Sequence, residues 1–186
     1  LQEPLGETIP NFHNMEFRMS QLIEAVENDK FCRIDDPEEG DGRHPIDNDP
    51  DHSDEVIAMI DEIDENSIEM CKAEQMFREG VLPKRICHCD TKVNNILFDK
   101  DGNVLCVIDL DTVMPSFIFS DFGDFLRTAA CTAAEDEPDT SKISFDMEIF
   151  KSFAKGYIES AGGFLTDMEK KNLPYAACMF PFMQAV

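Results

Sequence analysis

The chain has 186 residues, and its 16 Lys and Arg against 39 Asp and Glu give a formal net charge of −23. Such a charge repels phosphate backbones and anionic lipid surfaces, so we expect no binding to nucleic acid or to membranes. The 42% of hydrophobic residues, with 15 Phe, can build a core, which excludes wholesale disorder. The length suits one domain, or one lobe of a larger one.

Cysteine usage and hydropathy point to a cytoplasmic protein. The seven Cys are scattered and form no C-x-x-C pair, which is typical of reduced thiols rather than of a disulfide framework. The most apolar stretch, 176–186, is shorter than the roughly 17–25 residues needed to cross a bilayer. No signal-type segment follows Leu1. The apolar end has no helix stop signal, so we expect it to pack against a continuation of the chain.

The first half of the sequence predicts two helices separated by an acidic segment. Apolar residues recur at helical spacing over 14–28. Residues 35–65 then hold 14 acids and one base. Within them, 35–53 combines several Pro and Gly with almost no large apolar side chain, which predicts an acidic flexible insertion. A longer helix follows directly and is ended by Gly80.

The middle of the chain changes to the period of strands. Apolar runs at 96–98 and 104–108 flank a turn at 99–102 that ends in Asp-Gly, which predicts a β-hairpin. With the turn centred there, the numbers of paired residues sum to about 201. Asp109 is then expected opposite Lys92.

Three helices are predicted in the second half. The first covers 121–134 and has an Ala-rich small face, and the second covers 144–161 and ends before a Gly-Gly pair. A capping box at Thr166–Glu169 opens the third. The sequence therefore predicts an α+β fold that is mostly helical, with one small hairpin.

A group of polar residues brackets the hairpin. His88, Asp90 and Asn95 match the pattern H-x-D-x-x-x-x-N, and Asp109 follows the second strand. This is the phosphoryl-transfer layout of kinases. Because a hairpin folds its second strand back on its first, we expect Asp109 to lie beside Asn95 and close to Asp90.

Each position in this group has a chemical role in that layout. Asp90 can accept the proton of an attacking hydroxyl, and Lys92 can offset the charge of the transferring phosphoryl group. Asn95 and Asp109 offer hard oxygen ligands suited to Mg²⁺, with Asp111 as an additional ligand. The predicted catalytic residues are therefore Asp90 and Lys92, and the predicted metal ligands are Asn95, Asp109 and Asp111.

Two further residues are expected to support the loop. His88 is expected to brace it by a buried hydrogen bond. Asp121 opens a literal Asp-Phe-Gly but stands 31 residues after Asp90, too far for the hairpin to bring it to the metal. We therefore expect Asp121 to cap the following helix or to brace the backbone of the loop. Cys87 and Cys89 would need two more nearby ligands to form a zinc site.

These residues carry a family resemblance. The blocks 88–99, 107–115 and 121–124 resemble the aminoglycoside phosphotransferase and choline kinase superfamily, small-molecule kinases with a protein-kinase-like fold. They look most like the branch that contains N-acetylhexosamine 1-kinase, which the segments 9–14 and 128–139 also resemble. The resemblance implies the mostly helical C-terminal lobe of that fold, with a small hairpin that carries the catalytic loop and the metal site.

The resemblance also implies an activity, which is ATP- and Mg²⁺-dependent transfer of the γ-phosphoryl group to a sugar hydroxyl. His13, Asn14 and Arg127 are candidate sugar contacts by the same resemblance. In this family a nucleotide-binding lobe precedes the catalytic loop, yet residues 1–87 contain no Gly-rich hairpin and no Val-Ala-x-Lys-like strand. We therefore expect residues 1–186 to be an incomplete phosphotransferase domain that cannot turn over alone.

Other functions stay open on the sequence alone. The acceptor could be another small hydroxyl compound, such as choline, an aminoglycoside or homoserine. A different class is a non-catalytic interaction module whose acidic segment binds a basic partner. Binding of magnesium nucleotide separates these classes, because a pure interaction module should show none.

Overall fold

The computed structural model describes residues 5–28, 50–134 and 137–186. The fold is α+β and mostly helical, with two small antiparallel sheets, as predicted. The helices are α1 (Met15–Asn28), α2 (Pro50–Met70), α3 (Lys72–Arg78), α4 (Ile118–Ala129), α5 (Met147–Ala161), α6 (Asp167–Lys171) and α7 (Leu173–Ala185). The strands are β1 (Arg85–Cys87), β2 (Ile96–Phe98), β3 (Val104–Val107) and β4 (Met114–Ser116).

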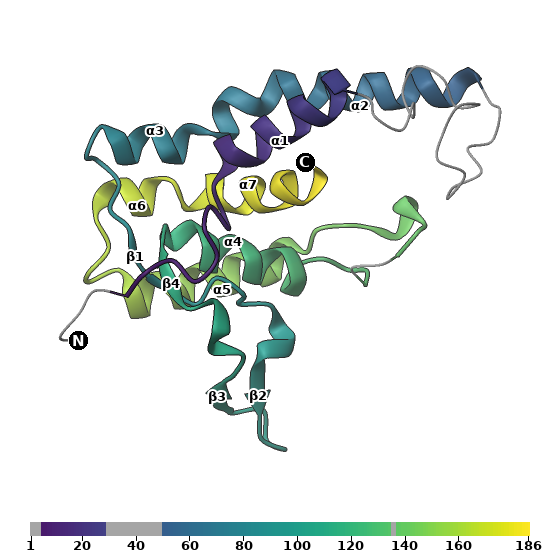
Figure 1. Ribbon diagram of the computed structural model, residues 1–186. Coiled ribbons are helices and arrows are strands. Elements are labelled where there is room, and N and C mark those ends of the chain that lie inside the picture. Colours follow the sequence, from purple (N-terminus) through teal and green to yellow (C-terminus); the bar gives the residue numbers. More distant parts are fainter. Residues whose placement is uncertain (1–4, 29–49, 135–136) are drawn as a thin grey trace.

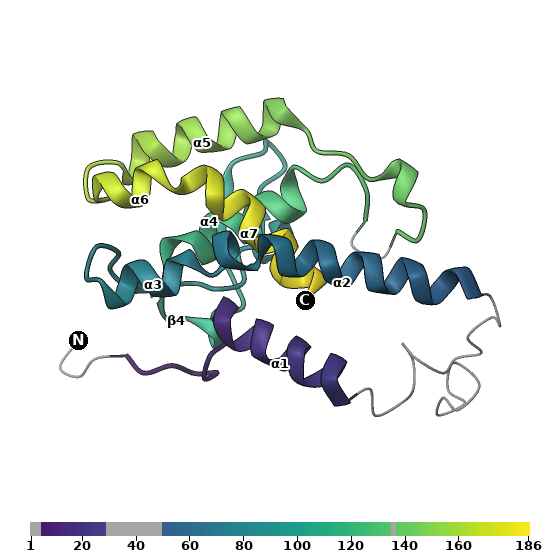
Figure 2. The ribbon, with the colours of Figure 1, turned by 90° about the horizontal axis from the view of Figure 1, so that it is seen from above.

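The helices form stacked layers. Figure 1 shows α1, α2 and α3 at one end of the molecule, α6 and α7 next to them, α4 and α5 beyond, and the hairpin β2–β3 projecting from the opposite end. Seen from above, α5 and α1 lie on the two outer sides, with α4, α7 and α2 between them (Figure 2). In the ranges that the structure describes, no helix is long and apolar enough to cross a membrane.

Most of the predicted helices are confirmed, with shifted ends. The prediction of a single long helix before Gly80 is wrong in one respect, because the helix breaks at Cys71 into α2 and α3. Gly80 does stop it and adopts a left-handed φ of 76°. The predicted insertion 35–53 lies outside the described residues, except for its last four positions, which belong to the first turn of α2. The capping box of Thr166 and Glu169 opens α6 as predicted.

The core is built around the contact between α4 and α7. Phe119 and Phe122 on α4 and Phe180 on α7 are almost completely buried. The backbones approach closely at Gly123, where an added Cβ would lie 2.4 Å from the carbonyl oxygen of Ala176. Helix α7 buries apolar side chains against helices of this chain, and the expectation that it also packs against a continuation of the chain stays a prediction.

The predicted hairpin forms, but its register differs. Ile96 pairs with Val107 and Leu97 with Cys106, so the partner numbers sum to 203 rather than about 201. The turn is longer than predicted because Asp99 accepts hydrogen bonds from the backbone N–H groups of Asp101 and Asn103. Asp109 is therefore in register with Asn94, not Lys92.

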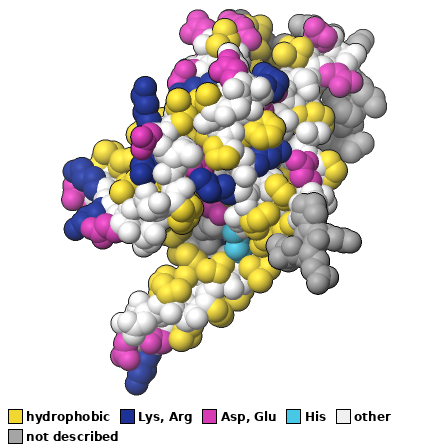
Figure 3. Space-filling model, turned by 90° about the vertical axis from the view of Figure 1, so that its left-hand side faces the viewer, with side chains coloured by type: hydrophobic (Ala, Val, Ile, Leu, Met, Phe, Trp, Pro, Cys, Tyr) yellow, Lys and Arg dark blue, Asp and Glu magenta, His cyan; other side chains and the backbone are white. Residues whose placement is uncertain are grey.

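The hairpin stands away from the helices. Figure 3 shows apolar side chains along its length, and the large apolar side chains of both strands are mostly exposed. Between the Leu97–Cys106 and Phe98–Val104 pairs the register shifts, so Leu105 is one extra residue on β3. The base of the hairpin adjoins the main body, at the end of the loop that carries His88, Asp90 and Asn95 (Figure 1).

Candidate active site

Three predicted site residues meet on the loop before the hairpin. The side-chain amide nitrogen of Asn95 donates hydrogen bonds to Oδ2 of Asp90 at 2.8 Å and to the backbone carbonyl oxygen of Asp90 at 2.9 Å. The Nζ atom of Lys92 lies 3.0 Å from the same Oδ2. Asn95 is only 5% exposed, whereas the side chain of Asp90 is 22% exposed. The carboxylate of Asp90 is therefore partly accessible to solvent and is held by the buried side-chain amide of Asn95.

Helix α4 holds this loop through Asp121. Its carboxylate accepts hydrogen bonds from the backbone N–H groups of His88 at 3.0 Å and Cys89 at 2.8 Å. The hydroxyl of Thr91 donates to the backbone carbonyl oxygen of Asp121 at 2.7 Å. Burial raises the pKa of the Asp121 carboxyl, while these backbone N–H groups lower it. Asp121 does not cap α4, because Phe117 occupies the N-cap position.

His88 ties the loop to the chain that leaves the hairpin. Its Nδ1 accepts a hydrogen bond from the backbone N–H of Asp90, so Nε2 carries the proton that is donated to the carbonyl oxygen of Ile108 at 2.9 Å. The hydroxyl of Thr112 donates to the carbonyl oxygen of His88 at 2.8 Å. Cys89 takes a left-handed φ of 64° between these contacts. The loop is thus fixed on both sides of Asp90.

The hairpin returns the chain to Asn95. The backbone N–H of Ile108 donates to the backbone carbonyl oxygen of Asn95 at 2.9 Å, so Asp109 follows directly where the chain passes Asn95. Asp109 has a left-handed φ of 64° and turns the chain into the 3₁₀ turn Leu110–Thr112. Both Asp109 and Asp111 are exposed.

These side chains suit a hard divalent cation. Asn95 uses its amide nitrogen on Asp90, so the atom it can offer to a cation is its carbonyl oxygen. Asp109 and Asp111 offer carboxylate oxygens, and Mg²⁺ takes one or two such ligands together with water and phosphate oxygens. Within the described ranges, no three His, Cys, Asp or Glu side chains lie close enough together to hold a metal by themselves. The donor set therefore fits a cation that arrives with phosphate.

A groove of about 970 Å³ opens beside the loop. Lys92 and Asn94 line it from the loop, Arg127 and Thr128 from α4, and Gln184 from α7. Phe125, Ile143, Ile149 and Pro181 supply apolar wall. Lys92 connects the groove with the loop, because it lines the groove and also contacts Asp90, which is not itself a lining residue.

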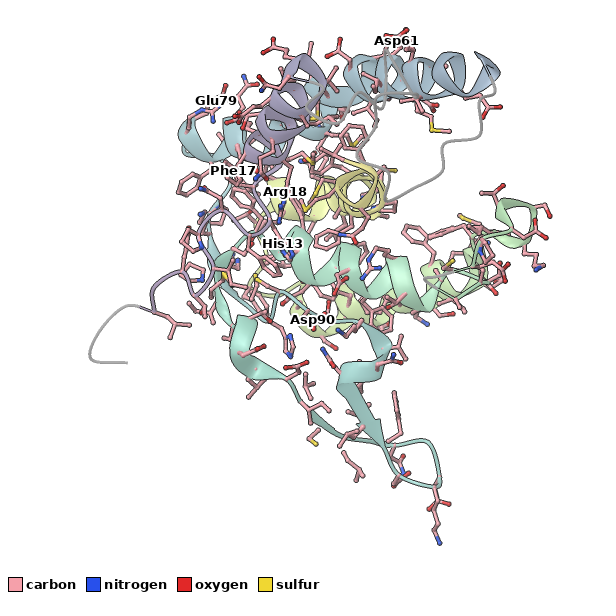
Figure 4. The ribbon with its side chains drawn as sticks, turned by 45° about the vertical axis from the view of Figure 1, so that its right-hand side comes forward. His13, Phe17, Arg18, Asp61, Glu79 and Asp90 are labelled. Carbon is pink, nitrogen blue, oxygen red and sulfur yellow. The ribbon has the colours of Figure 1, made fainter. Side chains whose placement is uncertain are left out.

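Two of the predicted sugar contacts, His13 and Asn14, lie immediately before α1 and contact other residues of the chain. Figure 4 shows His13 before α1, above the loop that carries Asp90. The His13 ring stacks on Phe12 and meets the edge of Phe180, with ring centres 4.2 and 4.9 Å apart. Burial lowers the pKa of His13 to about 4. The Oδ1 of Asn14 accepts the backbone N–H of Phe17 at 2.9 Å, at the start of α1.

His13 and Asn14 line a separate cavity of about 180 Å³, together with the buried Glu74. One oxygen of Glu74 accepts the backbone N–H of Met15 at 2.8 Å. Of the three predicted sugar contacts, only Arg127 lines the larger groove beside Lys92.

The cysteines on either side of His88 are buried thiols. Burial raises the pKa of Cys89 to about 12 and that of Cys87 further. In the absence of a metal, burial therefore favours the neutral thiol over the thiolate.

One residue of the site was missed by sequence reasoning. Asp124 is 3% exposed and accepts hydrogen bonds from Arg127, with Nη2 at 2.8 Å and Nε at 3.2 Å from its Oδ1. Its spacing of three residues from both Asp121 and Arg127 puts all three on one side of α4. This spacing could have indicated from the sequence that Asp124 belongs with Asp121 and Arg127. What the two acids contact is visible only in the structure.

A braced loop carboxylate, a short hairpin and a helix beneath them agree with the α+β, mostly helical fold of a kinase-like lobe. Residues 18–165 match the family model of the phosphotransferase enzyme family, APH. The match covers most of the 186 residues, so the chain belongs to this family.

Proposed function

We propose that this chain carries the catalytic loop and acceptor groove of an ATP- and Mg²⁺-dependent kinase that phosphorylates a sugar hydroxyl, with N-acetylhexosamine as the favoured acceptor. The observation that carries the proposal is the contact group of Asp90, Lys92 and Asn95, of which Lys92 also lines a groove. Membership of the phosphotransferase family supports the reaction class. The choice of sugar rests on the resemblance of the loop and its flanking blocks.

The loop residues divide the work of phosphoryl transfer. Asp90 takes the proton of the acceptor hydroxyl and holds that oxygen toward the phosphoryl group. Lys92 lies beside it and offsets the negative charge that the phosphoryl oxygens bring. Asn95 fixes the Asp90 carboxylate, since one amide group bonds both its side chain and its backbone. Most of the catalysis is therefore positioning.

Mg²⁺ would be held by Asn95 and Asp109, with Asp111 close by on the following turn. When bound, the ion would neutralise phosphate charge and orient the nucleotide. The exposure of Asp109 and Asp111 agrees with ligands that are completed by a nucleotide from outside this lobe.

The groove suits a polyhydroxyl acceptor. Lys92, Arg127 and Gln184 provide hydrogen-bond donors for hydroxyl and carbonyl oxygens, and Phe125 provides an apolar surface. The sequence predicts that nucleotide binding needs a further lobe, and this stays a prediction. The isolated chain is therefore expected to be inactive.

The test is a phosphorylation assay of the full-length protein with ATP and Mg²⁺. N-Acetylhexosamines are compared with unmodified hexoses, choline, homoserine and an aminoglycoside. Preferred transfer to N-acetylhexosamines supports the proposal, and transfer to choline, homoserine or an aminoglycoside instead assigns the alternative acceptor. A protein that neither binds magnesium nucleotide nor transfers phosphate is an interaction module, and the proposal is then wrong.

A further inference from the structure

Asp124 is a buried acid whose one strong partner faces the acceptor groove. Its side chain is 5% exposed, and its Oδ1 accepts both the Nε and Nη2 hydrogen bonds of Arg127 one helical turn later. Arg127 itself is 20% exposed and lines the groove with Lys92. The pair of Asp124 and Arg127 therefore connects the buried side of α4 with the wall of the groove.

Asp124 cannot contact an acceptor directly. Its second oxygen, Oδ2, is fully buried and has no hydrogen-bond partner among the described residues. Burial raises the pKa of this carboxyl, and the hydrogen bond and charge of Arg127 oppose that rise. Burying a carboxylate of this kind costs free energy that only a paired cation offsets, so the guanidinium of Arg127 is held against Asp124.

We propose that Asp124 is a positioning residue that fixes the guanidinium of Arg127 on the wall of the groove, so that it determines how tightly the acceptor binds. The inference rests on the proposed function, since it assigns the groove to the acceptor. Two fixed nitrogens on one carboxylate oxygen restrict a side chain that otherwise has many rotamers. Because Arg127 lines the groove, its side chain is thereby held on the groove wall.

A competing role for Asp124 is support of the catalytic loop. The backbone N–H of Thr91 also lowers the pKa of Asp124, which places this acid near the loop as well as near Arg127. The two roles differ in their kinetics. Loss of loop support lowers kcat, whereas loss of an acceptor contact raises KM for the acceptor.

The experiment is a double-mutant cycle in the full-length protein, with kcat and the acceptor KM measured at saturating ATP. Arg127→Met and Asp124→Ala are each expected to raise the acceptor KM about 10-fold to 100-fold, the loss expected for a hydrogen bond to a charged group. The double variant is expected to match either single variant. Asp124→Asn, which keeps an acceptor oxygen, is expected to restore part of the affinity.

Glu169→Gln is the matched control, because Glu169 is also a buried acid paired with an arginine, Arg85, but lies outside the groove. It is expected to leave the acceptor KM unchanged. The inference is wrong if the effects of Asp124→Ala and Arg127→Met on the acceptor KM multiply in the double variant. It is also wrong if the single variants lower kcat at constant KM. Either result leaves the proposed kinase function in place. Absence of phosphorylation of every acceptor by the wild-type protein overturns the proposed function, and the inference with it.

Discussion

Asn95 and Asp90 are locked together by one amide group, which donates to the carboxylate Oδ2 at 2.8 Å and to the backbone carbonyl oxygen at 2.9 Å. Lys92 approaches the same Oδ2 at 3.0 Å. Both contacts use Oδ2, so we expect Oδ1 to be the oxygen that takes a proton from the acceptor. One short loop thus fixes the orientation of Asp90, the proposed base, and places a positive charge beside it.

Asp90→Asn is expected to lower kcat by about 100-fold to 10,000-fold, because an amide cannot take the acceptor proton. The fold should be retained, since the amide oxygen of the substituted side chain can still accept the hydrogen bond of Asn95. The measurement is the rate of phosphoryl transfer in the full-length protein, with circular dichroism as the check on folding. A variant that keeps the wild-type rate would remove Asp90 from the role of base.

Asp121→Ala is expected to release the catalytic loop. The substitution leaves the backbone N–H groups of His88 and Cys89 without their acceptor, which should cost about 2–4 kcal/mol of unfolding free energy. Hydrogen exchange of these two amides should become faster than exchange in α7. Asp139→Ala, which removes an exposed acid from an outer turn, is the control and should change stability by less than about 1 kcal/mol. Unchanged protection at His88 would contradict the proposed bracing.

Gly123→Ala is expected to destabilise the protein by about 1–3 kcal/mol, because the new Cβ would meet the carbonyl oxygen of Ala176 at 2.4 Å and force α4 and α7 apart. Gly156→Ala is the matched control. Gly156 also lies inside a helix, α5, but nothing lies within 4 Å of an added Cβ. That variant should gain about 0.5–1 kcal/mol from helix propensity. Chemical denaturation of both variants measures the difference, and equal effects would refute the close α4–α7 contact.

His13 is expected to weaken the fold on mild acidification. Its pKa is lowered to about 4 in the folded chain by burial, so the unfolded chain, with an ordinary pKa near 6.5, binds a proton first. The stability linked to His13 is therefore fully present above about pH 6.5 and is lost as the pH falls toward 4.

The test compares the wild-type chain with His13→Phe, which keeps a ring against Phe12 and Phe180 but cannot titrate. Between pH 7 and pH 5 the wild-type chain should lose roughly 1–2 kcal/mol more unfolding free energy than the variant. Taking the difference between the two proteins cancels the titration of the many acids. Parallel pH profiles would mean that His13 is accessible to protons in the folded state.

The parts of the site that are formed by neighbouring residues could be predicted because their sequence patterns are short. The spacing of His88, Asp90 and Asn95 and the Asp-Gly turn each lie within one loop or one hairpin, so no distant contact is needed to recognise them. The sum of partner numbers was wrong by two for two reasons. The turn includes Asn103, which is bonded to Asp99, and this raises the sum to 202 at the Phe98–Val104 pair. The extra residue Leu105 on β3 raises it to 203.

The sequence alone determined the mostly helical composition, the hairpin and the order of the loop side chains, since periodicity and turn chemistry act over a few neighbouring residues. Only the tertiary structure decided that Asp121, 31 residues after Asp90, bonds the loop backbone, and that Asp124, 34 residues after Asp90, bonds an arginine that lines the groove. That placement depends on burying Phe119 and Phe122 against α7, a long-range packing choice that fixes the height and rotation of α4. Residues that are close in sequence therefore indicate the type of chemistry. The packing of helices that are distant in sequence decides how the side chains lie relative to one another.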